Sequence, residues 1–354
     1  MGARRSPLAP LALASSHTAI PPPPRLIAHA HCRYNKGLVH DALAAAQAFG
    51  KATFFITFTA NPAWPEIADL LYPGQGWDDR VDVVNRVFKL KLSDMIRQLR
   101  NGTIFSKPDG SPWKSRHIMW VVEFQKRGLP HAHIAVRLEG EDDAQPREAA
   151  EIDRHISAKI PAVTCARGDD CACDQHRVNK IVRTQLLHGC RRGVCIPTEP
   201  NKPQVCGKRF PKPLCAETTL DSGGFPCYAR GAADINVVPY NAKLLLRFDA
   251  HINVELCVGA KYISYLHKYT HKGSDKIRIT VDTLRAAGVN TEDSTEMFEV
   301  MRYISASEAV WRMMGFDINH SDVGCTRLPV HLDGGDWVSA QDGEDGPVYD
   351  PNKA

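Results

Sequence analysis

Two apolar segments joined by a short turn constrain the fold more than any other part of this chain of 354 residues. Residues 117–124 are HIMWVVEF and residues 133–138 are HIAVRL, and the polar turn QKRGLP between them contains Gly128. Runs of β-branched and aromatic residues separated by so short a turn are typical of a β-hairpin. We therefore expect two neighbouring antiparallel strands within a sheet.

Further segments predict helices and strands around this hairpin. A helix over residues 41–50 ends at Gly50 and is followed by the strand FFITFT at residues 54–59. Residues 79–100 form an amphipathic helix, residues 141–160 a charged loop and helix, residues 240–258 are strand-like, and helices follow over residues 260–273 and 305–316. On the helix over residues 79–100, the apolar face comprises Val83, Val87, Leu90, Met95 and Leu99. Ser305 followed by Glu308 is a capping pattern for the last helix. Together these elements predict an α+β fold with a mainly antiparallel central sheet flanked by helices.

Cysteine is concentrated in one region of the chain. Eight of the 11 cysteines lie between Cys165 and Cys227, together with His176 and His188. This distribution is typical of metal binding inside the cell rather than of a disulfide framework in a secreted domain. Residues 165–230 also carry 11 Lys and Arg against 6 Asp and Glu, although the net charge of the whole chain is only +4. We therefore expect a locally basic insert that is stabilised by metal.

Four of these side chains have a suitable spacing for a closed tetrahedral zinc site. They are His188, Cys190, Cys195 and Cys206, in the pattern His-x-Cys-x4-Cys-x10-Cys. Cys165, Cys171, Cys173 and His176 form a second such set, and Cys215 and Cys227 are possible substitutes. The alternative is that these residues are free buried cysteines, since neither spacing is that of a standard zinc finger. A zinc ion here would have a structural role.

The sequence Pro130-His131-Ala132-His133 places two imidazoles on one face of a strand, because alternate side chains of a strand point the same way. Glu123 and Gln125 share a face of the partner strand, and a register that pairs Gln125 with His131 also pairs Glu123 with His133. Two histidines with a neighbouring oxygen ligand suit a divalent metal ion. The alternative is that both are surface or structural histidines.

Tyr265 and Tyr269 are four residues apart on a predicted helix that also carries Lys261, Lys268 and Lys272. Aromatic residues at helical spacing usually pack in a core. The lysines favour a second interpretation, because a cationic helix attracts a phosphate and stabilises developing negative charge. A tyrosine hydroxyl there would act as a covalent nucleophile and form a phosphotyrosine.

Several segments, in this order, resemble the Rep domain of Helitron transposases: FFITFTANPAWPEI, RVFKLKL, VVEFQKRGLPHAHI, HGC and CGKRFPKPL, HINVELCVGAKYISYLHKYTHKGSD, and RYISASEAVWR. The resemblance implies a fold of the HUH-nuclease type in which His131 and His133 bind Mg²⁺ or Mn²⁺. It also implies catalytic tyrosines at Tyr265 and Tyr269 with Lys272 alongside, while Gln125 is the preferred third metal ligand and Glu123 the alternative. Lys261 and Lys268 would contact DNA.

Composition and the resemblance together predict a division of the chain into five parts. Residues 1–40 would be a disordered leader, residues 41–160 the first part of the nuclease domain, residues 161–230 the insert rich in Cys and His, residues 231–332 the second part of the nuclease domain with the tyrosine helix, and residues 333–354 a flexible acidic tail.

The resemblance also implies that the protein nicks and rejoins single-stranded DNA at transposon ends in rolling-circle transposition. One tyrosine becomes attached to the 5′ phosphate, and a 3′ hydroxyl is released. No G-x-x-x-x-G-K-[ST] motif occurs, so we expect no ATP hydrolysis by this chain and a helicase domain or protein as its partner. Such a DNA substrate implies a nuclear location, and no apolar run is long enough for a membrane span.

Two other functions are consistent with the residues. One is an inactive, zinc-stabilised remnant of a Helitron protein that binds DNA without forming a covalent adduct. The other is a metal-dependent hydrolase that uses an activated water molecule instead of tyrosine.

Overall fold

The computed structural model describes residues 44–125, 128–140, 145–166, 171–198, 201, 203–258 and 305–323. Five strands form one sheet in the order β6-β1-β3-β2-β7, and each pair of neighbours is antiparallel. These strands are β1 (Phe54–Thr59), β2 (Ser115–Phe124), β3 (Pro130–Leu138), β6 (Ile252–Leu256) and β7 (Asn319–Ser321). The expected α+β fold with an antiparallel central sheet is confirmed.

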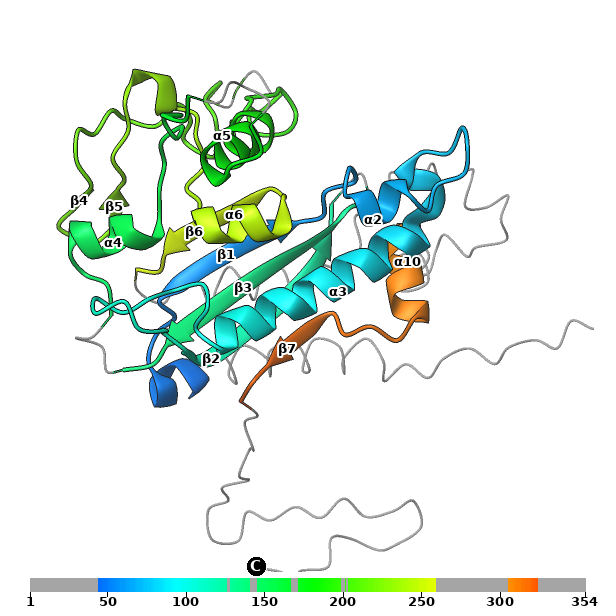
Figure 1. The fold of residues 1–354 in the computed structure, drawn as a ribbon, viewed down its shortest axis with the longest axis horizontal. Helices are drawn as coiled ribbons and strands as arrows, with labels where there is room; N and C mark the ends of the chain where they lie inside the picture. The colour runs from blue at the N-terminus through cyan, green and yellow to red at the C-terminus, as the bar shows by residue number, and fades with distance from the viewer. Residues whose placement is uncertain are drawn as a thin grey trace, which may run out of the picture.

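The helices of the described residues fall mainly in two groups. Near the sheet are α2 (Pro65–Ala68), a 3₁₀ turn (Trp77–Arg80), α3 (Val81–Arg100), α6 (Ala242–Phe248) and α10 (Ala306–Met313). The segment between β3 and β6 contains α4 (Ala149–His155), α5 (Asp174–Gln185), a 3₁₀ turn (Ala232–Asp234) and a small hairpin of β4 (Thr219–Leu220) and β5 (Pro226–Cys227). Figure 1 places α5 and the small hairpin beyond the edge of the sheet that β6 forms.

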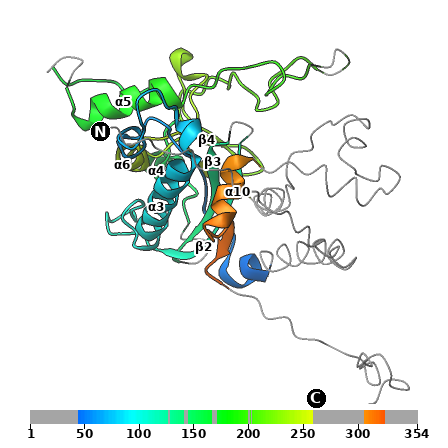
Figure 2. The same cartoon turned by 90° about the vertical axis from the view of Figure 1, so that its right-hand side faces the viewer.

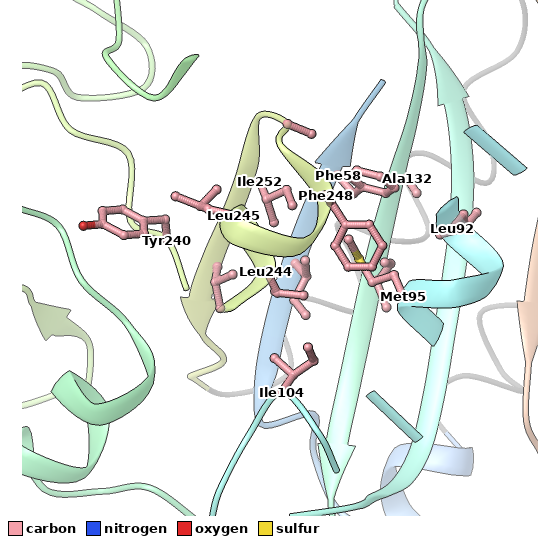
Figure 3. Close-up of a cluster of buried hydrophobic side chains, with 14 of the residues drawn as sticks. Phe58, Leu92, Met95, Ile104, Ala132, Tyr240, Leu244, Leu245, Phe248 and Ile252 are labelled. Carbon is pink, nitrogen blue, oxygen red and sulfur yellow. The ribbon is translucent and has the colours of Figure 1, made fainter. Parts of the chain in front are cut away.

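One face of the sheet is covered by α3 and α6 (Figures 1 and 2). Phe54, Ile56 and Phe58 alternate along β1 and are fully buried on this face. Figure 3 shows Leu92 and Met95 of α3 and Phe248 of α6 gathered around Phe58 and Ala132. Burying such large side chains stabilises the fold by about 1.5–3 kcal/mol each, so this layer holds the strands in register.

The burial of α3 corrects one sequence expectation. Val83, Val87, Met95 and Leu99 are buried as predicted, but Leu90 is 71% exposed. The buried face follows Val84, Phe88, Leu92 and Ile96 at four-residue intervals, together with the predicted positions. Because each residue turns a helix by about 100°, Leu90 lies roughly 200° around the helix from Leu92, on the solvent side.

The segment expected to be strand-like is half helix. Residues 242–248 form α6, and only Ile252–Leu256 is a strand. The Asn241 side chain accepts a hydrogen bond from the N–H of Leu244 at 3.1 Å and so caps the helix. Asp249, with a φ of 41°, ends it in the left-handed conformation. Leu244, Leu245 and Phe248 then lie on one helical face against the core.

Three other helix predictions are confirmed where the structure describes them. Residues 44–49 are helical before Gly50, which has a φ of 86°. The charged segment contains α4. At α10 the Ser305 hydroxyl accepts a hydrogen bond from the N–H of Glu308 at 3.2 Å, as the capping pattern predicts. In contrast, the 12-residue helix α5 was not expected within the insert.

No helix in the described ranges is long and apolar enough to span a membrane. The predicted helix over residues 260–273 lies outside the described residues, as do the leader at residues 1–40 and the tail at residues 333–354.

Candidate functional site

The hairpin places His131 and His133 on the face of the sheet opposite α3. Ala132 between them is fully buried in the core on the α3 side, so the two imidazoles point the other way. Their ring centroids are 4.6 Å apart and their planes meet at 77°. His131 is 9% exposed and His133 is 3% exposed. Two imidazoles therefore lie side by side in a buried setting.

The register of the hairpin differs from the expected one by two residues. Glu123 pairs with His131 and Val121 with His133, instead of Gln125 with His131 and Glu123 with His133. The cause is a tighter turn, in which the N–H of Gln125 donates to the carbonyl of Leu129 at 3.0 Å and Pro130 already belongs to β3. Because the shift is an even number of residues, Glu123 stays on the same face as the histidines.

The expected side-chain contacts form diagonally across the strands. Glu123 Oε2 lies 3.3 Å from His133 Nε2, and Gln125 Nε2 lies 3.4 Å from His131 Nδ1. Glu123 is largely buried, with 13% of its side chain exposed, whereas Gln125 is exposed at the turn. The structure therefore brings together all four predicted residues, with the carboxylate more enclosed than the amide.

Two threonines of β1 complete this face, and the sequence reasoning missed both. Thr59 Oγ1 lies 2.6 Å from His131 Nδ1, and Thr57 Oγ1 lies 3.5 Å from His133 Nδ1. They pair directly with the two histidines across the β1–β3 ladder. The signal was present in FFITFT, where two hydroxyls alternate with the fully buried Ile56 and Phe58. Hydroxyls on Nδ1 fix the orientation of an imidazole whose Nε2 is to bind a metal.

The distance between His133 and Glu123 fits a shared metal ion. Two nitrogen or oxygen ligands at about 2.0–2.2 Å from one ion lie roughly 3.0–3.4 Å apart, and Nε2 and Oε2 are 3.3 Å apart. His131 is farther from this pair of atoms. Among the described residues, His131, His133 and Glu123 do not form a compact group with all ligand atoms within 4.8 Å of one another. The donor set fits a divalent ion at the pair, with His131 beside it.

The predicted zinc residues His188, Cys190, Cys195 and Cys206 do form a compact group. Their ligand atoms all lie within 4.8 Å of one another, and Cys206 Sγ is 3.3 Å from His188 Nε2. The N–H of Arg191 donates to Cys195 Sγ at 3.3 Å. Such an arrangement has the ligand set and closed geometry for a metal ion such as zinc.

Backbone turns hold this group in place and tune its thiols. The N–H of Gly207 donates to the carbonyl of Cys195 at 2.7 Å and joins two of the ligand-bearing loops. Burial opposes ionisation of Cys206, but the N–H groups of Phe210 and Lys208 lower the pKa of its thiol overall. Local desolvation and the neighbouring Cys206 and Cys195 thiols raise the pKa of the Cys190 thiol to about 11. The backbone N–H groups therefore favour the thiolate at Cys206 over the thiolate at Cys190.

The insert places positive charge beside this group. The ring of Phe210 stacks on that of His188 with centroids 4.3 Å apart, and Lys212 Nζ lies 4.8 Å from the Phe210 centroid. Burial, followed by the charges of Lys208 and Lys212, lowers the pKa of His188. A lower pKa favours the neutral imidazole, which is the form that binds metal.

The second cysteine set also gathers, although Cys215 and Cys227 join neither group. Cys165, Cys171, Cys173 and His176 have all their ligand atoms within 4.8 Å of one another. Cys215 is instead beside the small hairpin, where its N–H donates to the carbonyl of Arg230 at 3.3 Å. The described residues therefore contain two four-ligand groups, each with three thiols and one imidazole.

The predicted tyrosine helix lies outside the described residues. The same holds for Tyr265, Tyr269, Lys261, Lys268 and Lys272. Their positions relative to His131 and His133 stay a prediction.

The histidine pair lies within a segment that matches a known family. Residues 30–136 match the family described as the Helitron helicase-like domain at N-terminus. This Helitron-like segment is less than a third of the chain and includes β1, α3, β2 and both histidines. No curated protein matches the chain.

The two Cys/His groups and α6 follow the Helitron-like segment in the sequence, outside the match. The family match therefore covers β1, β2 and most of β3, the strands around the histidines, and does not extend to the insert.

Proposed function

We propose that this protein is a Helitron-type endonuclease of the HUH class that nicks and rejoins single-stranded DNA through tyrosine. The observation that carries the proposal is the pair His131 and His133 on one buried face, beside the Glu123 carboxylate, within the segment that matches the Helitron-like family. Two imidazoles and a carboxylate are a suitable donor set for a divalent ion. The match to a family of DNA-mobilising proteins supports DNA as the substrate on which that ion acts.

In this proposal the ligands of the divalent ion are His131, His133 and Glu123. Glu123 is favoured over Gln125 because its oxygen lies 3.3 Å from His133 Nε2 and its side chain is enclosed. Gln125 instead contacts Nδ1 of His131, the atom that also faces Thr59. A bound Mg²⁺ or Mn²⁺ would supply Lewis acidity that polarises the scissile phosphate and stabilises the departing 3′ oxygen.

The nucleophile in this proposal is the hydroxyl of Tyr265 or Tyr269. Its oxygen forms a bond to phosphorus as the bond from phosphorus to the 3′ oxygen breaks, and the phenolic proton is lost while the 3′ oxygen gains one. Lys272 would stabilise charge on the phosphate, and Lys261 and Lys268 would hold the DNA backbone. The phosphotyrosine keeps the energy of the broken phosphodiester for rejoining.

The insert would serve the nuclease by holding its loops around zinc. The group of His188, Cys190, Cys195 and Cys206 offers four protein ligands, and a closed set of four is characteristic of structural zinc sites. Its basic surroundings at Lys208 and Lys212 suit a phosphate backbone. The expected partners are single-stranded transposon ends and a helicase, with nuclear location following from the substrate.

The test is a cleavage assay with single-stranded oligonucleotides that carry transposon end sequences, labelled at the 5′ or the 3′ end, with and without Mn²⁺. We expect a denaturant-resistant adduct on the 3′-labelled fragment. It should vanish in Tyr265→Phe/Tyr269→Phe and in His131→Ala, and survive in His320→Ala, whose exposed histidine lies on β7. Glu123→Gln should lose more activity than Gln125→Ala. Cleavage without an adduct would overturn the tyrosine mechanism in favour of a water hydrolase.

The Cys/His groups favour one second function, an inactive DNA-binding remnant stabilised by zinc. Both groups are intact in the insert, whatever the state of the nuclease residues. This alternative predicts salt-dependent retention of single-stranded DNA with no cleavage under any metal condition. That result, across several end sequences, would replace the nuclease proposal.

A further inference from the structure

The group formed by Cys165, Cys171, Cys173 and His176 lies at the beginning of α5. Cys173 immediately precedes the helix, and His176 is in its first turn. Cys165 and Cys171 come from the preceding segment, and all four ligand atoms lie within 4.8 Å of one another. Four side chains from 12 consecutive positions are thus folded back onto one point.

The distances within the group fit coordination and exclude a disulfide bond between the first two cysteines. Cys165 Sγ lies 3.7 Å from Cys171 Sγ, whereas bonded sulfur atoms are about 2.05 Å apart. Two thiolates at about 2.3 Å from one tetrahedral zinc ion are separated by roughly 3.8 Å. Cys173 Sγ and His176 Nδ1 are 3.2 Å apart. The set therefore has the size of a tetrahedron around one ion.

Hydrogen bonds next to the group align the two segments that carry its ligands. The Thr164 N–H and hydroxyl donate to Gln175 Oε1 at 3.3 and 3.2 Å. Asn179 Nδ2 donates to the carbonyl of Pro161 at 2.7 Å. These contacts hold residues 161–164 against the first turns of α5, so that Cys165 lies close to Cys171 and Cys173.

The helix has a small apolar face of its own. Among its residues Val178, Ile181 and Val182 are buried, and its position is tied further by a hydrogen bond from Arg177 to the carbonyl of Leu246 in α6. No strand is assigned to the described residues from 156 to 173 that precede it. A segment that buries little apolar surface gains little stability from packing. A metal ion that cross-links it would stabilise its folded conformation.

We propose that Cys165, Cys171, Cys173 and His176 bind a second structural zinc ion that fixes the N-terminal end of α5. The first group begins at His188, three residues after the helix ends at Gln185, so the two ions bracket α5 at its two ends. Three thiolates and one imidazole select a borderline-soft ion over Mg²⁺ or Mn²⁺ and leave no coordination position for substrate.

The experiment measures zinc per chain by elemental mass spectrometry on full-length protein purified without chelator and dialysed against metal-free buffer. We expect two zinc ions in the wild type, one in Cys165→Ser/Cys171→Ser and one in His188→Ala/Cys206→Ser. Cys215→Ser is the matched control and should keep both, because its thiol belongs to neither group. One zinc ion in the wild type that survives in Cys165→Ser/Cys171→Ser would overturn the proposal.

A second measurement needs no variant and so does not depend on how well the variants fold. Wild-type protein is alkylated with and without prior chelation, and each cysteine peptide is quantified by mass spectrometry. Cys165, Cys171 and Cys173 should be protected until the chelator removes zinc, while labelling of Cys215 should not change. Equal labelling of Cys165 before and after chelation would contradict the site, even if the first group still holds its ion.

Discussion

Replacing Thr59 by Val tests how the sheet prepares His131 for metal binding. Valine keeps the β-branched shape that suits strand β1 and removes only the hydroxyl that lies 2.6 Å from His131 Nδ1. Loss of such an outer partner of a metal-binding histidine typically weakens metal affinity about 10–100-fold, or about 1.4–2.8 kcal/mol. The free energy of unfolding should fall by about 1 kcal/mol, the typical net contribution of one hydrogen bond.

The chain offers a matched control for this change. Thr57 lies on the same strand and faces the other histidine, but its hydroxyl is 3.5 Å from His133 Nδ1. Thr57→Val should therefore shift the Mn²⁺ dependence less than Thr59→Val, and Thr59→Ser should restore most of the affinity by restoring the hydroxyl. The assay is a Mn²⁺ titration of the nicking rate, with direct Mn²⁺ binding followed by electron paramagnetic resonance.

A folded Thr59→Val protein that kept the wild-type Mn²⁺ affinity would show that the Thr59 hydroxyl does not prepare His131 for metal binding. Equal losses of affinity in the two valine variants would also contradict the prediction, because the difference between 2.6 and 3.5 Å would then have no consequence for the metal.

Four other predictions follow from packing, burial and metal binding. Leu92→Ala should lower the free energy of unfolding by about 2–5 kcal/mol and Leu90→Ala by less than about 0.5 kcal/mol, since only Leu92 is buried; equal losses in denaturant melts would contradict the assigned face. Between α3 and α10, Asn85 Nδ2 donates to the Ser307 carbonyl at 2.7 Å and the Ser307 hydroxyl donates to Asn85 Oδ1 at 2.9 Å. Asn85→Ala and Ser307→Ala should therefore each lower the free energy of unfolding by about 1–3 kcal/mol, and the two losses should be strongly non-additive in a double-mutant cycle. Burial, with the charges of neighbouring basic residues, lowers the pKa of His155 to about 4. Between pH 6.5 and 4 the unfolded chain therefore binds a proton that the folded chain does not, and the stability of the fold should decrease as the pH drops through that range. His155→Phe should flatten this part of the pH profile of the melting temperature, and an unchanged slope would contradict the assignment. Zinc chelation should speed tryptic cleavage within α5 and leave cleavage within α3 unchanged, as read from peptide mass spectra over time.

Local patterns were sufficient for the elements whose signals are strong over a short distance. The strand FFITFT was predicted to the residue because its residues are β-branched or aromatic and a proline-marked turn follows from Asn61. The hairpin was predicted for the same reason. Its register was not, because the number of residues in the turn depends on whether Pro130 joins the strand, and the strand does include it.

The errors in the helices have different causes, some local and some tertiary. The run of leucines before Phe248 suits a strand or a helix, and the cap at Asn241 decided for the helix. Leu90 fits a helical face in the sequence, but the sheet lies on the side marked by Leu92. For α5, the metal-type cysteines masked a helix that buries only a few apolar residues.

The candidate site was predictable in its residue types but not in its supporting contacts. The HxH pattern and the acid of the partner strand follow from a two-residue period, which survives an even shift in register. The contact from Thr59 to His131 depends instead on which strand pairs with the other edge of β3. The two residues are 72 positions apart, and local sequence patterns do not predict so distant a pairing. For the cysteine groups, the spacing predicted which residues would be ligands, but only the structure shows that their ligand atoms lie close together.

The central claim is that a histidine-bound metal and a tyrosine cooperate on one phosphate of DNA. The most direct measurement is to incubate the protein with single-stranded transposon-end DNA and Mn²⁺, digest both components, and locate the nucleotide-bearing peptide by mass spectrometry. We expect a nucleotide linked through its 5′ phosphate to Tyr265 or Tyr269, and no such peptide from the His131→Ala protein. Metal-dependent cleavage with both tyrosines unmodified would contradict it.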